Sequence, residues 1–242
     1  MNEGLRRFGK RGEDAVRKEI KQLHDMGVIT PIHPTPEQKR SALQYLMFLK
    51  EKRSGAIKGR GCADGRPQRK TMSKEEASSR TPHTESIIIT SARDAAEKRV
   101  VVITDIPGAF LQANQEGKVY LRIEGSMAKA LLLIKPELYR TYVALRNGKK
   151  VLYVKLEKAL YGLLNSGLLF WKDLSSLLIK NGFELNPYDT CVANKVIDGT
   201  QCTIVYHVDD LKISHVKQSV VQDVLKFLTD RYGKLQTVTG HR

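Results

Sequence analysis

The sequence predicts an α+β fold built around a mainly antiparallel sheet. Short β-branched or alternating segments and amphipathic helical segments follow one another without the regular alternation of a parallel sheet. The pair Asp198-Gly199 stands between two apolar segments and is a strong signal for a two-residue hairpin, which joins antiparallel strands. With 242 residues, of which 41% are hydrophobic, the chain can form a sizeable core in one large domain or two lobes.

The N-terminal part of the chain predicts two helices. The first ends near Gly27, and its apolar side chains recur at helical spacing. These side chains are Val16, Ile20 and Leu23. Residues 35–38 (TPEQ) have the pattern of a capping box, with Pro36 at the first helical position. A second apolar stripe then predicts that residues 42–49 are helical. Its members are Ala42, Tyr45, Leu46 and Leu49.

Residues 50–70 are rich in lysine, arginine and glycine, and the polar segment 71–84 continues the same character. Such a segment buries too little apolar surface to hold one conformation by itself. It is interpreted either as a linker or as a mobile basic arm that orders on phosphate, and the density of cations favours the arm.

The rest of the chain alternates between strand and helix patterns. Residues 84–96 fit a short helix, although the run SIIIT within them equally fits a strand. Further strands are expected over 99–106, 118–124, 149–157, 191–197, 203–208 and 211–214. Helices are expected around 170–178, ending at Asn181-Gly182, and around 220–228.

The chain is strongly basic, because 41 lysines and arginines outnumber 26 aspartates and glutamates and give a formal charge of +15. This excess indicates a polyanionic partner, nucleic acid before membrane, unless it is simply a solvated surface. The three cysteines are odd in number and far apart, which indicates neither a disulfide framework nor a zinc site. The sequence has no apolar run of the about 18 residues needed for a membrane helix and no signal peptide, so an intracellular, soluble protein is expected.

Two adjacent carboxylates, Asp209 and Asp210, fall where the chain should turn between two apolar runs. Three interpretations fit them: a solvated turn, a single divalent-ion site, or part of a two-metal site for phosphoryl transfer. A two-metal site requires a further acidic ligand, and the best candidate is Asp105. This residue ends an apolar strand just before Pro107-Gly108.

Several motifs carry a resemblance to a known family. They are DIPGAFLQA at 105–113, LEKALYGLLNSGLLFW at 156–171, GFELNPYDTCVANK at 182–195 and HVDD at 207–210, with a weaker basic match at 57–66. In their order and spacing these motifs resemble the reverse transcriptase domain of copia-type retrotransposons. The resemblance runs from about residue 50 to near the C-terminus.

The resemblance implies an RNA-directed DNA polymerase that copies an RNA template from a DNA primer with deoxynucleoside triphosphates. It implies a palm, whose antiparallel sheet carries the metals, and fingers that close on the nucleotide. Asp105, Asp209 and Asp210 match the catalytic, metal-binding aspartates, which would hold two Mg²⁺ ions, for which Mn²⁺ can substitute. One metal would activate the primer 3′-hydroxyl and the other would neutralise the leaving pyrophosphate.

The resemblance also implies nucleotide-binding residues. They are Lys58, Arg60, Phe110, Gly162, Asn165 and Ser166. Phe110 matches the ring beneath the sugar, where it would disfavour a 2′-hydroxyl; from the residues alone it fits a core aromatic equally well. Asn165 and Ser166 would supply polar contacts, and their alternative is a helix cap. Lys58 and Arg60 would contact the triphosphate, a role for which Arg66, Arg69 and Lys70 are the alternatives.

The matching segments divide the chain into four parts. Residues 1–98 are expected to form N-terminal helices and the first part of the fingers, 99–117 the palm strand with the first aspartate, 118–157 a return to the fingers, and 158–242 the palm with the VDD hairpin. The thumb is expected to be absent or incomplete, as in a C-terminally truncated fragment. A missing thumb and RNase H portion, or another chain, is then an expected partner.

Two other functions compete with the polymerase. One is a catalytically inactive nucleic-acid-binding fragment of such a polymerase. The other is a nucleotide cyclase, against which the basic arm and the LYGLLNS segment argue. For the polymerase, the expected location is the cytoplasm, in a virus-like particle, or the nucleus, with no membrane association.

Overall fold

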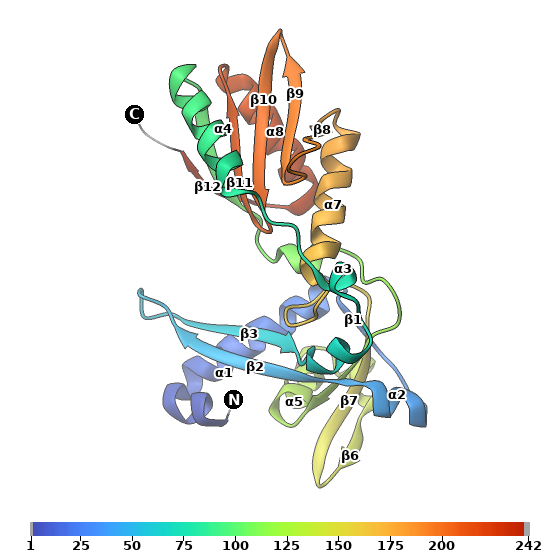
Figure 1. The fold of residues 1–242 in the computed structure, drawn as a ribbon. Coiled ribbons are helices and arrows are strands. Elements are labelled where there is room, and N and C mark those ends of the chain that lie inside the picture. Colours follow the sequence, from blue (N-terminus) through green and yellow to red (C-terminus); the bar gives the residue numbers. More distant parts are fainter. Residues whose placement is uncertain (1, 240–242) are drawn as a thin grey trace. The chain divides into compact units, whose positions relative to one another are not determined.

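The computed structural model describes residues 2–239, with side chains from residue 4 to residue 238. Met1 and residues 240–242, which belong to the expected domains 1–98 and 158–242, lie outside the described residues. The chain divides into two compact units (Figure 1). Unit 1 comprises Met1–Ala77 and Ala113–Ser166, and unit 2 comprises Ser78–Gln112 and Gly167–Arg242. Each unit has its own sheet, so the predicted α+β class is confirmed.

Unit 1 is a sheet with the strand order β1-β7-β5-β2-β3, to which β6 adds by pairing with β7. Its strands are β1 (Ile29–Pro31), β2 (Leu43–Glu51), β3 (Ile57–Ala63), β5 (Tyr120–Glu124), β6 (Ala144–Arg146) and β7 (Lys149–Leu156). Its helical segments are α1 (Asn2–Asp25), α2 (Pro36–Ser41), η1 (Arg66–Lys70), α3 (Lys74–Ala77), α5 (Ser126–Ile134), α6 (Pro136–Tyr139) and η3 (Arg140–Tyr142). The pair β2–β5 is parallel, and the other pairs are antiparallel.

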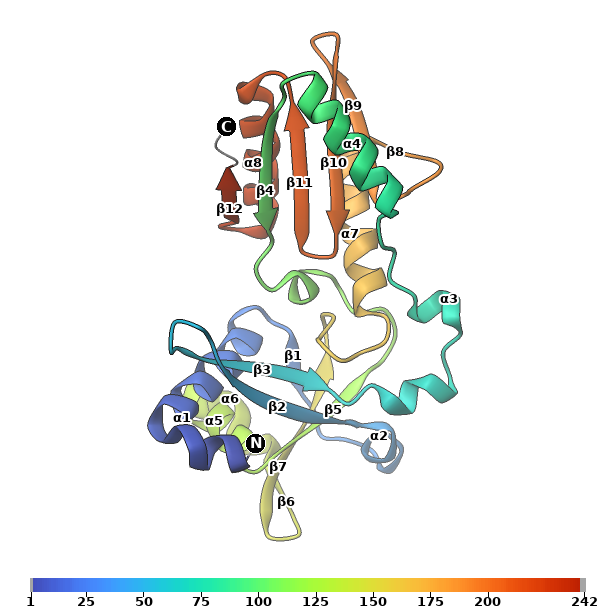
Figure 2. The ribbon, with the colours of Figure 1, turned by 60° about the vertical axis from the view of Figure 1, so that its left-hand side comes forward.

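Unit 2 is an antiparallel sheet with the order β12-β4-β11-β10-β9-β8 (Figure 2). Its strands are β4 (Val100–Asp105), β8 (Glu184–Leu185), β9 (Val192–Ile197), β10 (Thr200–His207), β11 (Asp210–His215) and β12 (Gln236–Thr239). Its helical segments are α4 (Thr84–Ala96), η2 (Ala109–Gln112), α7 (Ser166–Lys180) and α8 (Gln218–Tyr232).

Opposite faces of the unit 2 sheet are covered differently. The buried face carries Leu211 and Tyr206, and the Tyr206 hydroxyl lies 2.9 Å from Ser175 Oγ of α7. The other face carries Lys212, whose ammonium group bonds to α4. In Figure 2, α4 accordingly lies in front of the sheet, while α7 and α8 lie behind it.

Most local predictions are confirmed. The first helix, the capping box at Thr35, the hairpin at Asp198-Gly199 and the strands around the aspartates form as expected. The open choice for residues 84–96 resolves as the helix α4.

Two predictions in unit 1 are wrong. Residues 42–49 are not a helix, because β2 occupies Leu43–Glu51 with alternating burial. Residues 57–63 are not a loop, because β3 pairs with β2 along its whole length. Gly59 and Gly61 allow this strand to pack closely: a Cβ atom on Gly59 would lie 2.9 Å from the carbonyl oxygen of Ala15 in α1. Backbone pairing and close packing therefore compensate for the scarcity of apolar side chains.

Candidate active site

Asp105 and Asp210 face one another across two adjacent strands of unit 2. Asp105 ends β4 and Asp210 begins β11, and the antiparallel register pairs them directly. Directly opposite residues project from the same face of a sheet, with Cβ atoms about 4.5–5.5 Å apart. Asp210 is exposed and Asp105 is half-buried, so the pair lies at the solvent-accessible end of these strands.

Asp209 belongs to the tight turn that connects β10 to β11. His207 pairs with Asp210, which leaves Val208 and Asp209 as a two-residue loop. The backbone carbonyl of Asp209 accepts a hydrogen bond of 2.9 Å from the amide of Ile106, the residue that follows Asp105. This bond joins the turn to the end of β4, so all three aspartates lie in one small region of unit 2.

Val208 adopts a strained backbone conformation in this turn. Its φ of 55° lies in the left-handed region, which a β-branched residue rarely adopts. Strain of this kind costs about 1–3 kcal/mol and persists where the surrounding structure imposes it. Here the flanking strand pairs impose the turn geometry, and with it the place of Asp209.

Helix α4 anchors the face of β11 on which Asp210 projects. Lys212, two residues after Asp210, bonds to three α4 side chains. Its Nζ atom lies 2.9 Å from Thr90 Oγ1, 3.1 Å from Ser91 Oγ and 2.7 Å from Asp94 Oδ2. Asp94 is buried and Lys212 is mostly covered, so this ion pair is largely shielded from solvent.

The three aspartates offer only carboxylate oxygens, the donors that Mg²⁺ and Mn²⁺ prefer. In donor chemistry the set fits a hard divalent cation. Among the described residues, however, no three histidine, cysteine, aspartate or glutamate side chains are grouped closely enough to hold a metal ion. The strands therefore bring Asp105 and Asp210 together, whereas the Asp209 side chain does not complete a three-ligand cluster.

Phe110 lies in the short 3₁₀ segment after Asp105. Gly108, at φ 67°, turns the chain, and its carbonyl accepts a hydrogen bond of 2.8 Å from the amide of Leu111. Leu111 is buried, whereas Phe110 is half-buried. Half-burial of Phe110 leaves part of its ring packed and part accessible, so it fits both a core aromatic and a ring that contacts a nucleotide.

Lys58 and Arg60 are exposed on β3 of unit 1. They line a hollow of about 650 Å³ together with side chains of β2 and of the turn that follows it. These are Phe48, Lys50, Glu51, Lys52 and Arg53. The Arg60 guanidinium also lies 5.1 Å from the centroid of the Tyr161 ring. A concave surface with several cations fits an anionic ligand.

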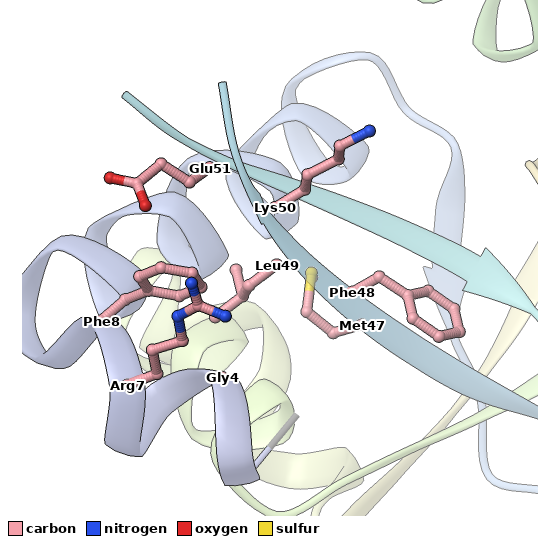
Figure 3. Close-up of a pocket in the computed structure, with 8 residues that line it drawn as sticks. All are labelled: Gly4, Arg7, Phe8, Met47, Phe48, Leu49, Lys50 and Glu51. Carbon is pink, nitrogen blue, oxygen red and sulfur yellow. The ribbon is translucent and has the colours of Figure 1, made fainter. Parts of the chain in front are cut away.

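A second hollow, of about 460 Å³, lies between α1 and β2 (Figure 3). In this view Leu49 points toward Phe8, whereas Phe48 and Lys50 point away from α1. On β3, the amide of Gly61 donates a hydrogen bond of 2.8 Å to Glu19 Oε1 of α1, and burial raises the pKa of that carboxyl group. Helix α1 thus supports one face of the hairpin, while Lys58 and Arg60 project from the other.

Gly162 and Ser166 are occupied by contacts within unit 1, whereas Asn165 is buried with one side-chain atom unsatisfied within the described part of the chain. Gly162 has a φ of 89°, and a Cβ atom there would lie 2.1 Å from the carbonyl oxygen of Ala63. Ser166 is buried and donates a hydrogen bond of 2.6 Å to the carbonyl of Leu160. Asn165 is also buried, and its Oδ1 has no hydrogen-bond partner among the described residues. The close backbone approach that Gly162 permits is therefore made to the chain's own backbone.

Sequence reasoning missed two features of this region. The strain at Val208 had only a weak signal, namely a β-branched residue in a two-residue hairpin loop. The tether between Lys212 and Asp94 had no signal, because the two residues are far apart in the sequence and only the fold brings them together.

Comparison with known protein families shows to which family this chain belongs. A family model described as "Reverse transcriptase (RNA-dependent DNA polymerase)" matches residues 32–239. The chain belongs to this reverse transcriptase family. The resemblance drawn from the motifs is thereby confirmed, and the matched range includes all nine predicted site residues of this reverse transcriptase chain. No curated protein matches it. None of the helices over residues 2–239 combines the length and apolar character needed to cross a membrane.

Proposed function

We propose that this chain carries the RNA-directed DNA polymerase domain of a copia-type element. The reaction is transfer of a deoxynucleotide from its triphosphate to the 3′-hydroxyl of a primer paired with an RNA template. The observation that carries the proposal is the direct pairing of Asp105 with Asp210, next to a strained turn that holds Asp209. Family membership supports the reaction class, and the carboxylate arrangement supports its location in unit 2.

In this proposal unit 2 is the palm and unit 1 is the fingers. An antiparallel sheet with aspartates at a strand end and at a hairpin turn supports the first assignment. The exposed cations Lys58 and Arg60 beside a hollow support the second, with a role in binding phosphate groups. Gly162 and Ser166 then act by holding the polypeptide in place, since their contacts are internal.

Asp105, Asp209 and Asp210 are the residues that would hold Mg²⁺. When bound, such cations supply positive charge that lowers the pKa of a hydroxyl nucleophile and offsets charge on the departing pyrophosphate. The chain's contribution is to fix the carboxylates. The β4–β11 register sets the separation of Asp105 and Asp210, and the Ile106–Asp209 backbone bond sets the turn. Phe110 would lie against the sugar and disfavour a 2′-hydroxyl.

The test is primer extension on an RNA template with Mg²⁺ and deoxynucleoside triphosphates. Asp210→Asn and Asp209→Asn should each abolish extension, and chelation of the metal should do the same to the wild type. Asp223→Asn is the matched control, because it removes an exposed carboxylate of α8 in the same unit. Its extension should remain at the wild-type level.

Loss of extension in Asp223→Asn as well would show that removal of any carboxylate from unit 2 inactivates the chain. Asp209 and Asp210 would then have no specific role in the chemistry. An inactive wild type that still binds template–primer in a salt-sensitive manner would overturn the polymerase proposal. It would support a nucleic-acid-binding fragment instead.

A further inference from the structure

A basic hollow of about 510 Å³ lies on unit 1. Its lining residues differ from those of the hollow that contains Lys58 and Arg60. Four cationic side chains from three elements line it: Lys39 and Arg40 of α2, Arg122 of β5 and Arg146 of β6. We call this hollow the β6 groove. Among the described residues that line the β6 groove, none is acidic. Its volume falls in the range of ligand-binding clefts, which is about 300–1,000 Å³.

The two arginines of the β6 groove are held in place by one carboxylate. Glu124 Oε1 lies 2.8 Å from Arg122 Nε and 2.9 Å from Arg146 Nη1. A single carboxylate neutralises one of the two guanidinium charges, so the cluster keeps a net positive charge. Because each guanidinium carries five N–H donors, most donors remain available for another anion.

The elements that carry these cations are locally rigid. Helix α2 begins with a complete capping box, in which Gln38 N bonds to Thr35 Oγ1 and Thr35 N bonds to Gln38 Oε1. The β6–β7 hairpin turns through Asn147 at φ 49° and Gly148 at φ 70°, as a two-residue turn with left-handed residues requires. A site whose groups are already positioned loses less conformational entropy on binding.

The aromatic side chain that lines the β6 groove offers little exposed surface for base stacking. Tyr153 and Val151 line it, but both are buried in a small cluster with Ala42. Rigid cations above a closed apolar floor fit phosphate groups rather than bases.

We propose that the β6 groove binds the phosphate backbone of single-stranded RNA. The choice of RNA rests on the proposed function, for which an unpaired template is the natural partner. The site itself rests on the four cations and their support. It is distinct from Lys58 and Arg60, which lie on β3 and line another hollow.

The experiment measures binding of a fluorescent oligouridylate to the full chain by anisotropy, with chelator present so that no catalysis occurs. Lys39→Gln/Arg40→Gln removes two adjacent cations from a helix of the groove. Arg17→Gln/Lys18→Gln is the matched control, since it removes two adjacent, exposed cations from the solvent side of α1. Arg146→Gln tests the β6 side of the groove independently.

For single strands, log K falls with log salt concentration at about 0.7 per neutralised phosphate. Loss of two contacts should make this slope shallower by about 1.4, which is a loss of about 25-fold in affinity at 0.1 M salt. Arg146→Gln should show about half of the slope change, and the control should bind as the wild type does. Equal losses in groove and control variants would overturn the proposal, because they would indicate attraction by overall charge only.

Binding of a duplex RNA of the same length shows whether the β6 groove prefers single-stranded to double-stranded RNA. If the groove variants weaken duplex and single-strand binding equally, the single-strand assignment is overturned. Asp210→Asn separates this proposal from the proposed function: it should lose primer extension but retain the full difference between groove and control variants. A wild type that extends primers while its groove variants bind RNA normally would overturn the groove and leave the polymerase intact.

Discussion

Lys212 Nζ lies 2.7 Å from Asp94 Oδ2 and thereby ties β11, the strand that begins at Asp210, to helix α4. The Lys212 side chain is 17% exposed and that of Asp94 is 6% exposed, so the pair is largely removed from solvent. In such a pair each charge is tolerated only because the other is present. The tether therefore links the stability of unit 2 to the strand that carries the aspartate pair.

Lys212→Met should lower the free energy of unfolding by about 3 kcal/mol, because it leaves the buried carboxylate of Asp94 without its cation. Asp94→Ala/Lys212→Met should recover more than half of that loss, since neither charge then remains buried alone. Chemical denaturation of the two variants and the wild type measures both quantities. A double variant as unstable as the single one would show that the pair is not coupled.

Val208→Gly should raise stability and lower activity. Glycine adopts a φ of 55° without steric cost, so the folded state is relieved of strain. The unfolded chain gains entropy from the glycine, which offsets part of this, and the net stabilisation should be about 0.5–1 kcal/mol. The turn would at the same time lose the rigidity that fixes Asp209, so primer extension should slow. Val208→Ala keeps a Cβ atom and should give little gain. Thermal denaturation and extension rates on the three proteins test this, and a destabilised glycine variant would contradict it.

Gly162→Ala should be strongly destabilising for two reasons. Its new Cβ atom would meet the Ala63 carbonyl oxygen at 2.1 Å, and the alanine would have to adopt a φ of 89°. Strain and overpacking together should cost about 3–4 kcal/mol. Gly117→Ala is the control in the same unit, with a φ of 75° and no atom within 4 Å of the added Cβ. It should cost only the backbone strain, about 1–2 kcal/mol. Similar losses in urea denaturation would show that the close approach is unimportant.

Stability should fall at alkaline pH through two buried thiols of unit 2. Burial raises the pKa of Cys191 to about 12 and that of Cys202 to about 11. The unfolded chain releases these protons from about pH 8.5, whereas the folded protein keeps them. Their contribution is therefore complete below about pH 8.5 and is lost as the pH rises toward the folded values, by up to about 1.4 kcal/mol per pH unit for each thiol.

Cys191→Ala/Cys202→Ala tests this assignment. Its midpoint of thermal unfolding should be lower at neutral pH, because two core side chains are truncated, but should decline less steeply between pH 8.5 and 10.5. The same steepness in variant and wild type would assign the alkaline loss to other groups, such as buried tyrosines.

Local sequence patterns predicted a large part of this fold, because the physical causes are local. The alternation in residues 118–124 and 149–157 produced β5 and β7, and the Asp198-Gly199 pair produced a turn with both residues at positive φ. Likewise, the Thr35 capping box formed as its spacing required. In the candidate site, the sequence placed Asp105 at a strand end and Asp209-Asp210 at a turn; in the structure Asp105 ends β4, Asp209 lies in the turn and Asp210 begins β11.

Other features were decided by partners distant in the chain. The apolar residues of 42–49 fit both a helical stripe and the alternation of a strand, and pairing with β3 selected the strand. The segment 57–63 has few apolar side chains, and it became a strand because it pairs with β2, while Gly59 lets α1 approach its backbone and Gly61 leaves room for Tyr45 of β2.

By itself, the sequence determined which residues carry chemistry and which local conformations their neighbours prefer. Only the tertiary structure decided that Asp105 is opposite Asp210, that Lys212 is paired with Asp94, and that cations of α2, β5 and β6 surround one hollow. The physical reason is that periodicity, capping and turn preferences act over a few residues. Strand register and ion pairing depend instead on contacts between segments whose separation along the chain carries no local signal.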